Sequence, residues 1–215
     1  MPAAKICGLS DRSGLDAALA GGARYVGFVV FPKSPRHIDP AGAASLAAHA
    51  RGRAETVAVL VNPSDADLAA LTPLAPDWIQ LHGHESPARV AEARRHARKG
   101  VIRALQVSAA ADLDAARAYE PAADMLLFDA KAPAGADRPG GHGAAFDWRI
   151  LAGRRFSRPW FLSGGLTPEN VAEAARISHA PLVDVSSGVE AAPGLKDPAR
   201  IAAFLAAAHS TLEPA

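Results

Sequence analysis

The sequence has little of several features on which whole classes of protein depend. One cysteine in 215 residues excludes an intrachain disulfide framework. The 23 basic and 22 acidic residues leave a formal net charge of +1, which gives no electrostatic footprint for nucleic acid or an anionic membrane surface. No window reaches the roughly 20 apolar residues of a membrane-spanning helix. These absences predict no nucleic-acid partner and no membrane partner.

Cellular compartment and domain number follow from the same kind of observation. Lys5 and Asp11 interrupt any apolar stretch that would make a signal peptide near the first residue. With a single cysteine, this favours the reducing cytoplasm. No linker or change of composition divides the chain, so we expect residues 1–215 to form one domain. The sequence leaves a monomer and a homodimer both open.

Short aliphatic runs alternate with alanine-rich amphipathic segments along the chain. Strands that are apolar on both faces suit a buried parallel sheet, whose crossovers are supplied by helices. Eight such units in about 200 residues predict a compact TIM barrel. An open doubly wound sheet is the alternative, but its first strand usually precedes a glycine-rich turn, and Cys7-Gly8-Leu9-Ser10 is not one. The predicted strands are Ala4–Cys7, Tyr25–Phe31, Thr56–Val61, Trp78–Leu81, Val101–Val107, Asp124–Phe128, Trp160–Leu162 and Leu182–Val185.

Proline after a capping residue marks several predicted helix starts. The sixth crossover is the exception, because 131–146 is rich in glycine and proline and is expected to be a long loop, with a short helix near Trp148–Leu151. The four marked starts are Asp39-Pro40, Ser86-Pro87, Thr167-Pro168 and Asp197-Pro198.

The first and sixth predicted strands end in side chains that can transfer protons. Cys7 ends the first strand, where barrel enzymes place catalytic groups, although a lone thiol is often only a small buried hydrophobe. Asp129 follows four apolar residues, and such low-dielectric surroundings favour the protonated carboxyl and suit a general acid. Lys5 has the strand parity of Cys7 and either favours its thiolate or packs the barrel floor.

Glycine and serine clusters follow the last two predicted strands, where barrels bind phosphate. Their backbone N–H groups can approach an anion closely, so we expect a phosphorylated small-molecule substrate. A third cluster, in the sixth crossover, is either a further phosphate contact or a flexible segment. The candidate phosphate-binding residues are Gly164, Gly165, Ser186, Ser187, Gly141 and Gly143.

Four further residues at predicted strand ends are expected to contact the substrate. Arg36 follows the second strand, and its fork-shaped guanidinium suits a carboxylate. Gln80 and His82 end the fourth strand, and Asp184 ends the eighth beside the phosphate loop. His82, His84 and Glu85 make a weak zinc pattern that lacks a further ligand, so no metal is predicted.

Taken together, these segments resemble the phosphoribosylanthranilate isomerases of tryptophan biosynthesis. The matching motifs occur in the family's order and span essentially the whole chain. They are Lys5–Gly8, Gly27–Arg36, Val59–Asn62, Ile79–Gly83, Leu127–Lys131, Gly140–Gly143 with Phe146–Trp148, Leu162–Val171 and Asp184–Glu190.

The resemblance implies an eight-fold barrel and a cofactor-free Amadori rearrangement. In this reaction an aldose-ketose isomerase, classed as an intramolecular oxidoreductase, converts N-(5-phosphoribosyl)anthranilate into 1-(2-carboxyphenylamino)-1-deoxyribulose 5-phosphate. It further implies Cys7 as general base, Asp129 as general acid and Arg36 on the anthranilate carboxylate.

Two alternatives remain open on the sequence. Another phosphosugar barrel enzyme would share the phosphate loops, but the histidine-pathway isomerase would want aspartates where Cys7 and Gln106 stand. A catalytically inactive barrel kept for interactions would be expected to lack Cys7 or Asp129, and both are present.

Overall fold

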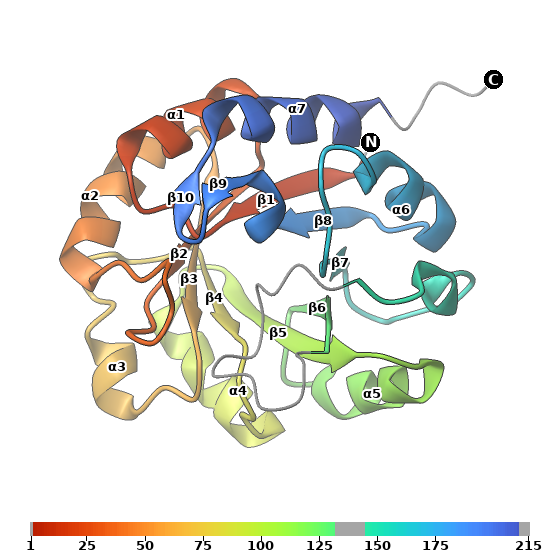
Figure 1. The fold of residues 1–215 in the computed structure, drawn as a ribbon. Helices are drawn as coiled ribbons and strands as arrows, with labels where there is room; N and C mark the ends of the chain where they lie inside the picture. The colour runs from red at the N-terminus through yellow and green to blue at the C-terminus, as the bar shows by residue number, and fades with distance from the viewer. Residues whose placement is uncertain (1, 132–144, 211–215) are drawn as a thin grey trace.

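Eight parallel strands close into a barrel in the computed structural model, which describes residues 2–131 and 145–210 (Figure 1). Each strand pairs with the next in the chain, and β8 pairs with β1 to complete the ring. The predicted TIM barrel is therefore confirmed. The strands are β1 (Ala3–Cys7), β2 (Tyr25–Val29), β3 (Glu55–Leu60), β4 (Trp78–Leu81), β5 (Gly100–Val107), β6 (Met125–Ala130), β7 (Trp160–Leu162) and β8 (Leu182–Val185).

The helices lie around the outside of the barrel (Figure 1). Several crossovers are completed by short 3₁₀ helices, including the expected one at Trp148–Leu151. Within the described ranges no helix has the length and apolar character needed to cross a bilayer. The α-helices are α1 (Arg12–Ala20), α2 (Pro40–Ala50), α3 (Asp65–Ala69), α4 (Pro87–Ala93), α5 (Ala116–Tyr119), α6 (Val171–Ser178) and α7 (Pro198–His209).

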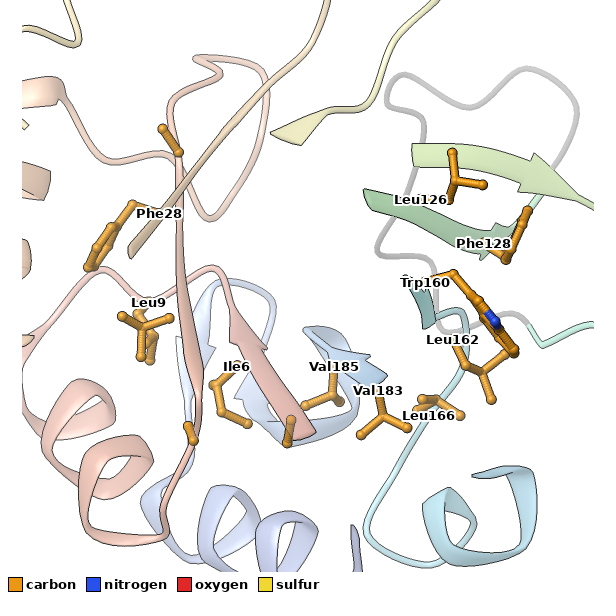
Figure 2. Packing of buried hydrophobic residues seen from close by; sticks show 14 of the residues in the cluster. Ile6, Leu9, Phe28, Leu126, Phe128, Trp160, Leu162, Leu166, Val183 and Val185 are labelled. Atoms are coloured by element: carbon orange, nitrogen blue, oxygen red, sulfur yellow. The ribbon is translucent and has the colours of Figure 1, made fainter. Parts of the chain in front are cut away.

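Alternation along each strand produces two separate apolar clusters. Side chains of one parity point outward and pack against the helices, and Figure 2 shows Ile6, Phe28 and Leu162 among the labelled members of this outer cluster. Side chains of the other parity fill the barrel, where Tyr25 packs edge-to-face on Phe161. The interior is thus a packed core.

Three of the four predicted helix caps are confirmed. Asp39 accepts hydrogen bonds from two backbone N–H groups at the start of α2, Asp197 does the same for α7, and Ser86 accepts one in α4. Each such cap stabilises its helix by about 1 kcal/mol.

The prediction that α6 begins after Thr167 is wrong. Thr167 Oγ1 accepts from Glu169 N–H, and the Asn170 amide donates back to Gly165 O, so these residues form a turn and the helix starts at Val171. A hairpin that was not predicted follows β8. Its strands are β9 (Glu190–Ala192) and β10 (Leu195–Lys196), and it lies beside the C-terminal end of β1 (Figure 1).

Candidate active site

The candidate residues Cys7, Gln80, Asp129 and Asp184 share the inward strand parity and lie toward the C-terminal ends of their strands. All four are buried. Closure of the barrel therefore brings together a thiol from β1 and carboxyl groups from β6 and β8, as the sequence predicted for a barrel mouth.

A buried ion pair lies beneath the thiol. Lys5 is fully enclosed, and its Nζ lies 2.8 Å from Asp184 Oδ1, while Ser163 Oγ donates to Asp184 Oδ2 at 2.9 Å. Burial disfavours the ammonium, but Asp184 and the neighbouring Cys7 outweigh that effect and raise the pKa of Lys5. Lys5 is thus a permanent cation next to the thiol.

Cys7 is more enclosed than a thiol exposed at the mouth would be. It is only 6% accessible, and burial raises the pKa of its thiol, although the Lys5 ammonium acts in the opposite direction. Desolvation thus outweighs the neighbouring cation and holds the pKa of the Cys7 thiol above its usual value.

Gly27 on β2 provides the space for Cys7 and Lys5. It pairs with Cys7 in the sheet register, and a Cβ atom there would lie 3.2 Å from Cys7 Sγ and 3.3 Å from Lys5 Cε. Any larger residue would press on both functional side chains, so this strand glycine is required by close approach.

Asp129 lies with His82 and Gln80. Its Oδ1 accepts from Ala130 N–H at 3.0 Å, and its Oδ2 lies 3.2 Å from His82 Nε2. Gln80 Nε2 is 3.3 Å from His82 Nδ1. His82 Nε2 and Gln80 Oε1 are buried without an aligned hydrogen-bond partner, so the His82–Asp129 approach is close but poorly directed. Polar atoms left in this state can serve an incoming ligand.

The loop that carries His82 is held by a second buried ion pair, on the outward face of β5. Arg103 Nη1 lies 2.5 Å from Glu85 Oε2, and the same carboxylate accepts from the backbone N–H groups of Asn62 and Gly83. The Glu85 carboxylate therefore fixes the loops after β3 and β4 through these bonds. Within the described residues, no group of three or more histidine, cysteine or acidic side chains is arranged to hold a metal ion.

Arg36 is buried and forms a charged cluster with two residues for which no role was expected. Its Nε and Nη2 donate to the two oxygens of Glu190 at 2.7 and 2.9 Å. Lys196 Nζ lies 2.7 Å from Glu190 Oε1. Glu190 and Lys196 come from the β9–β10 hairpin, for which Gly194 between two short segments was the available sequence signal.

The two predicted phosphate loops lie against each other. Gly164 and Gly165 have φ angles of +85° and +65°, and a Cβ at Gly188 would lie only 1.9 Å from Leu166 O. Ser186 and Ser187 precede Gly188 in the second loop and are partly exposed. The structure thus brings both clusters to one place. Gly141 and Gly143 lie outside the described residues.

Comparison with known proteins gives one consistent family. The model of the family described as N-(5'phosphoribosyl)anthranilate (PRA) isomerase matches residues 4–207. The N-(5'-phosphoribosyl)anthranilate isomerase of Paracoccus denitrificans is 57% identical over 209 residues, which is 97% of each chain. The enzyme of that name from a Caulobacter species is 56% identical over 207 residues, covering 95% of this chain and 97% of the relative.

Similar solved structures belong to the same family. Phosphoribosyl anthranilate isomerase from Thermotoga maritima superposes with a TM-score of 0.87 at 36% identity, covering 97% of this chain and 99% of that one. A phosphoribosyl anthranilate isomerase in complex with reduced 1-(o-carboxyphenylamino)-1-deoxyribulose 5-phosphate gives a TM-score of 0.82 at 32% identity, with the same coverage.

Proposed function

Because the chain belongs to the N-(5'-phosphoribosyl)anthranilate isomerase family and catalyses that family's reaction in tryptophan biosynthesis, we propose that Cys7 and Asp129 move the protons. The observation that carries this assignment is that one thiol and one carboxyl, from β1 and β6, share the inward parity at the same end of the barrel. General acid–base catalysis needs two such groups on either side of the reacting atoms.

Asp129 acts as the acid in the first step. Its carboxyl gives a proton to the furanose ring oxygen, the bond from that oxygen to C1 breaks, and the anilino nitrogen lone pair forms the C1=N bond of an iminium. His82, 3.2 Å away, lies where it can hold the carboxylate that remains.

Cys7 acts as the base in the second step. Its thiolate removes the proton from C2, leaving an enolamine, which becomes the ketone when the C2 hydroxyl loses its proton and C1 gains one. Burial favours the neutral thiol in the free enzyme, so Cys7 first releases its proton to solvent, and the iminium formed in the first step then places a positive charge next to the sulfur. That charge and the Lys5 ammonium both favour the thiolate at the moment when it is needed.

The remaining residues bind and orient the substrate. Arg36 holds the anthranilate carboxylate with its fork-shaped guanidinium. The loops at Gly164-Gly165 and Ser186-Ser187 hold the phosphate, and Gln80, His82 and Asp184 face the sugar. The mechanism calls for no cofactor, and we place the reaction in the cytoplasm.

Turnover of phosphoribosylanthranilate, followed by the loss of anthranilate-type fluorescence, tests the assignment. Cys7→Ala and Asp129→Asn should each reduce kcat by at least about 100-fold, because each removes a proton-transfer group. Inhibition by inorganic phosphate should stay near the unmodified protein's value. Near-normal kcat in either variant would contradict the role of that residue, and a change confined to KM in Asp129→Asn would make Asp184 the candidate acid.

A further inference from the structure

The hairpin after β8 brings a carboxylate to Arg36 from 154 positions away in the sequence. Glu190 accepts from Nε and Nη2 of Arg36 in two nearly equal bonds, the geometry in which a carboxylate fixes the plane of a guanidinium. Both side chains are about 5% exposed. The pair is therefore well protected from solvent screening.

Lys196 holds Glu190 from the other side. Its Nζ contacts Glu190 Oε1 at 2.7 Å and Ser186 O at 2.8 Å, and Ser186 Oγ donates to the carbonyl of Cys7 at 3.1 Å. Attraction to Arg36 and Lys196 outweighs the effect of burial and holds the pKa of Glu190 below its usual value. Glu190 is thus an ionised carboxylate with a fixed position.

Two glycines let this cluster form at short range. Gly8 leaves space for the Arg36 stem, because a Cβ at Gly8 would lie 2.7 Å from Arg36 Cδ. Gly194, at the hairpin turn, approaches the backbone of Pro35 so closely that a Cβ would lie 2.3 Å from Pro35 O. The hairpin is therefore packed directly against the residue that precedes Arg36.

We propose that Glu190 is a positioning residue that orients Arg36 for the carboxylate on the substrate's aromatic ring and so sets the preference for a carboxylated substrate. This inference rests on the proposed contact between Arg36 and that carboxylate. A guanidinium held along one edge by a carboxylate has its plane fixed, so less side-chain freedom is lost when the substrate binds.

A comparison of two ligands tests the proposal. The first is reduced 1-(o-carboxyphenylamino)-1-deoxyribulose 5-phosphate, and the second is the same molecule without the ring carboxyl. Calorimetry on Glu190→Gln should show about tenfold or greater weakening for the carboxylated ligand and less than about twofold for the other, because only the first needs an oriented Arg36. In turnover, KM should rise while kcat changes by less than about threefold.

Equal weakening of both ligands would show a general structural role and overturn the proposal, and so would unchanged binding of both. Arg36→Met, measured in parallel, separates this proposal from the one on which it rests. If Arg36→Met keeps the preference for the carboxylated ligand, the Arg36 assignment fails. If Arg36→Met loses the preference and Glu190→Gln keeps it, only the role of Glu190 fails.

Further variants control for a folding defect. Lys196→Met keeps the Arg36–Glu190 bonds, so its ligand preference should stay within about threefold of the unmodified protein, and a larger loss would overturn the proposal. Glu190→Asp keeps the charge and should restore part of the preference. If Glu190→Gln fails to fold, the double variant Glu190→Gln/Lys196→Met replaces it. Removing Lys196 as well leaves fewer buried cations without a carboxylate partner, and this variant should still lose the preference for the carboxylated ligand.

Discussion

At the scale of single residues, the charges around Cys7 decide how readily its thiol ionises. Burial raises the pKa of Cys7, and the Lys5 ammonium opposes that rise. Iodoacetamide reacts only with the thiolate, so the labelling rate should increase with pH to a midpoint above the ordinary thiol value of about 8.5. Lys5→Met should move this midpoint to still higher pH, because a cation is lost and Asp184 is left unpaired. The pH profile of labelling, followed by mass spectrometry, measures the midpoint.

Lys99→Met provides the matched control for that experiment. Lys99 is a partly exposed lysine just before β5, at the opposite end of the barrel from Cys7, so its removal should leave the midpoint unchanged. A substrate analogue should slow labelling by covering the thiol. A lower midpoint in Lys5→Met, or full activity after complete single labelling, would contradict the role given to the pair.

At the scale of elements, the two phosphate loops depend on their mutual contact. Gly188→Ala should push the loop after β8 away from Leu166, since its Cβ would meet a backbone oxygen that cannot rotate aside. We expect the competitive inhibition constant of inorganic phosphate and the substrate KM both to rise roughly tenfold or more, because small misplacements of binding groups cost that much. Steady-state kinetics with phosphate as competitor provides the measurement.

Gly42→Ala in α2 is the control for this substitution. Its Cβ would meet the Ile38 side chain at 3.1 Å and Asp39 Oδ1 at 3.7 Å, in a helix outside both loops. Phosphate inhibition should therefore match that of the unmodified protein. If Gly188→Ala binds phosphate as well as Gly42→Ala does, the loop contact is not part of the anion site.

At the scale of the whole molecule, the described surface has little exposed hydrophobic area that a second copy of the chain could bury. Leu195 is the one large hydrophobic side chain that is exposed within residues 2–131 and 145–210. Because stable homodimer interfaces are more apolar than ordinary surface, we predict a monomer. Light scattering after size exclusion should give the mass of one chain, 22.2 kDa, at all concentrations tested. A mass near twice that value would contradict the prediction.

We further propose that the chain is a single domain. The strands close on themselves, and α7 near the end of the chain packs against α1 near its beginning. We therefore expect thermal unfolding in one cooperative transition.

Features that depend on neighbouring residues can be predicted from the sequence alone. Short aliphatic runs between helical segments predicted all eight barrel strands, with ends within about three residues of those in the structure. Asp-Pro and Ser-Pro pairs gave three helix starts, because a cap and its N–H partners lie within one turn. The same strand ends supplied the thiol, the carboxyl and the glycine clusters, and the order of the motifs supplied the family.

Contacts between residues that are distant in the sequence become visible only in the folded chain. Lys5 meets Asp184 and Arg36 meets Glu190 because the barrel closes and the hairpin folds back, which no local pattern encodes. Burial raises the pKa of Cys7 against the effect of the Lys5 ammonium, since desolvation depends on everything packed around the thiol. The sequence thus named the groups that we propose to react, whereas their surroundings come from folding, because electrostatic energies depend on distance and dielectric rather than on position in the chain.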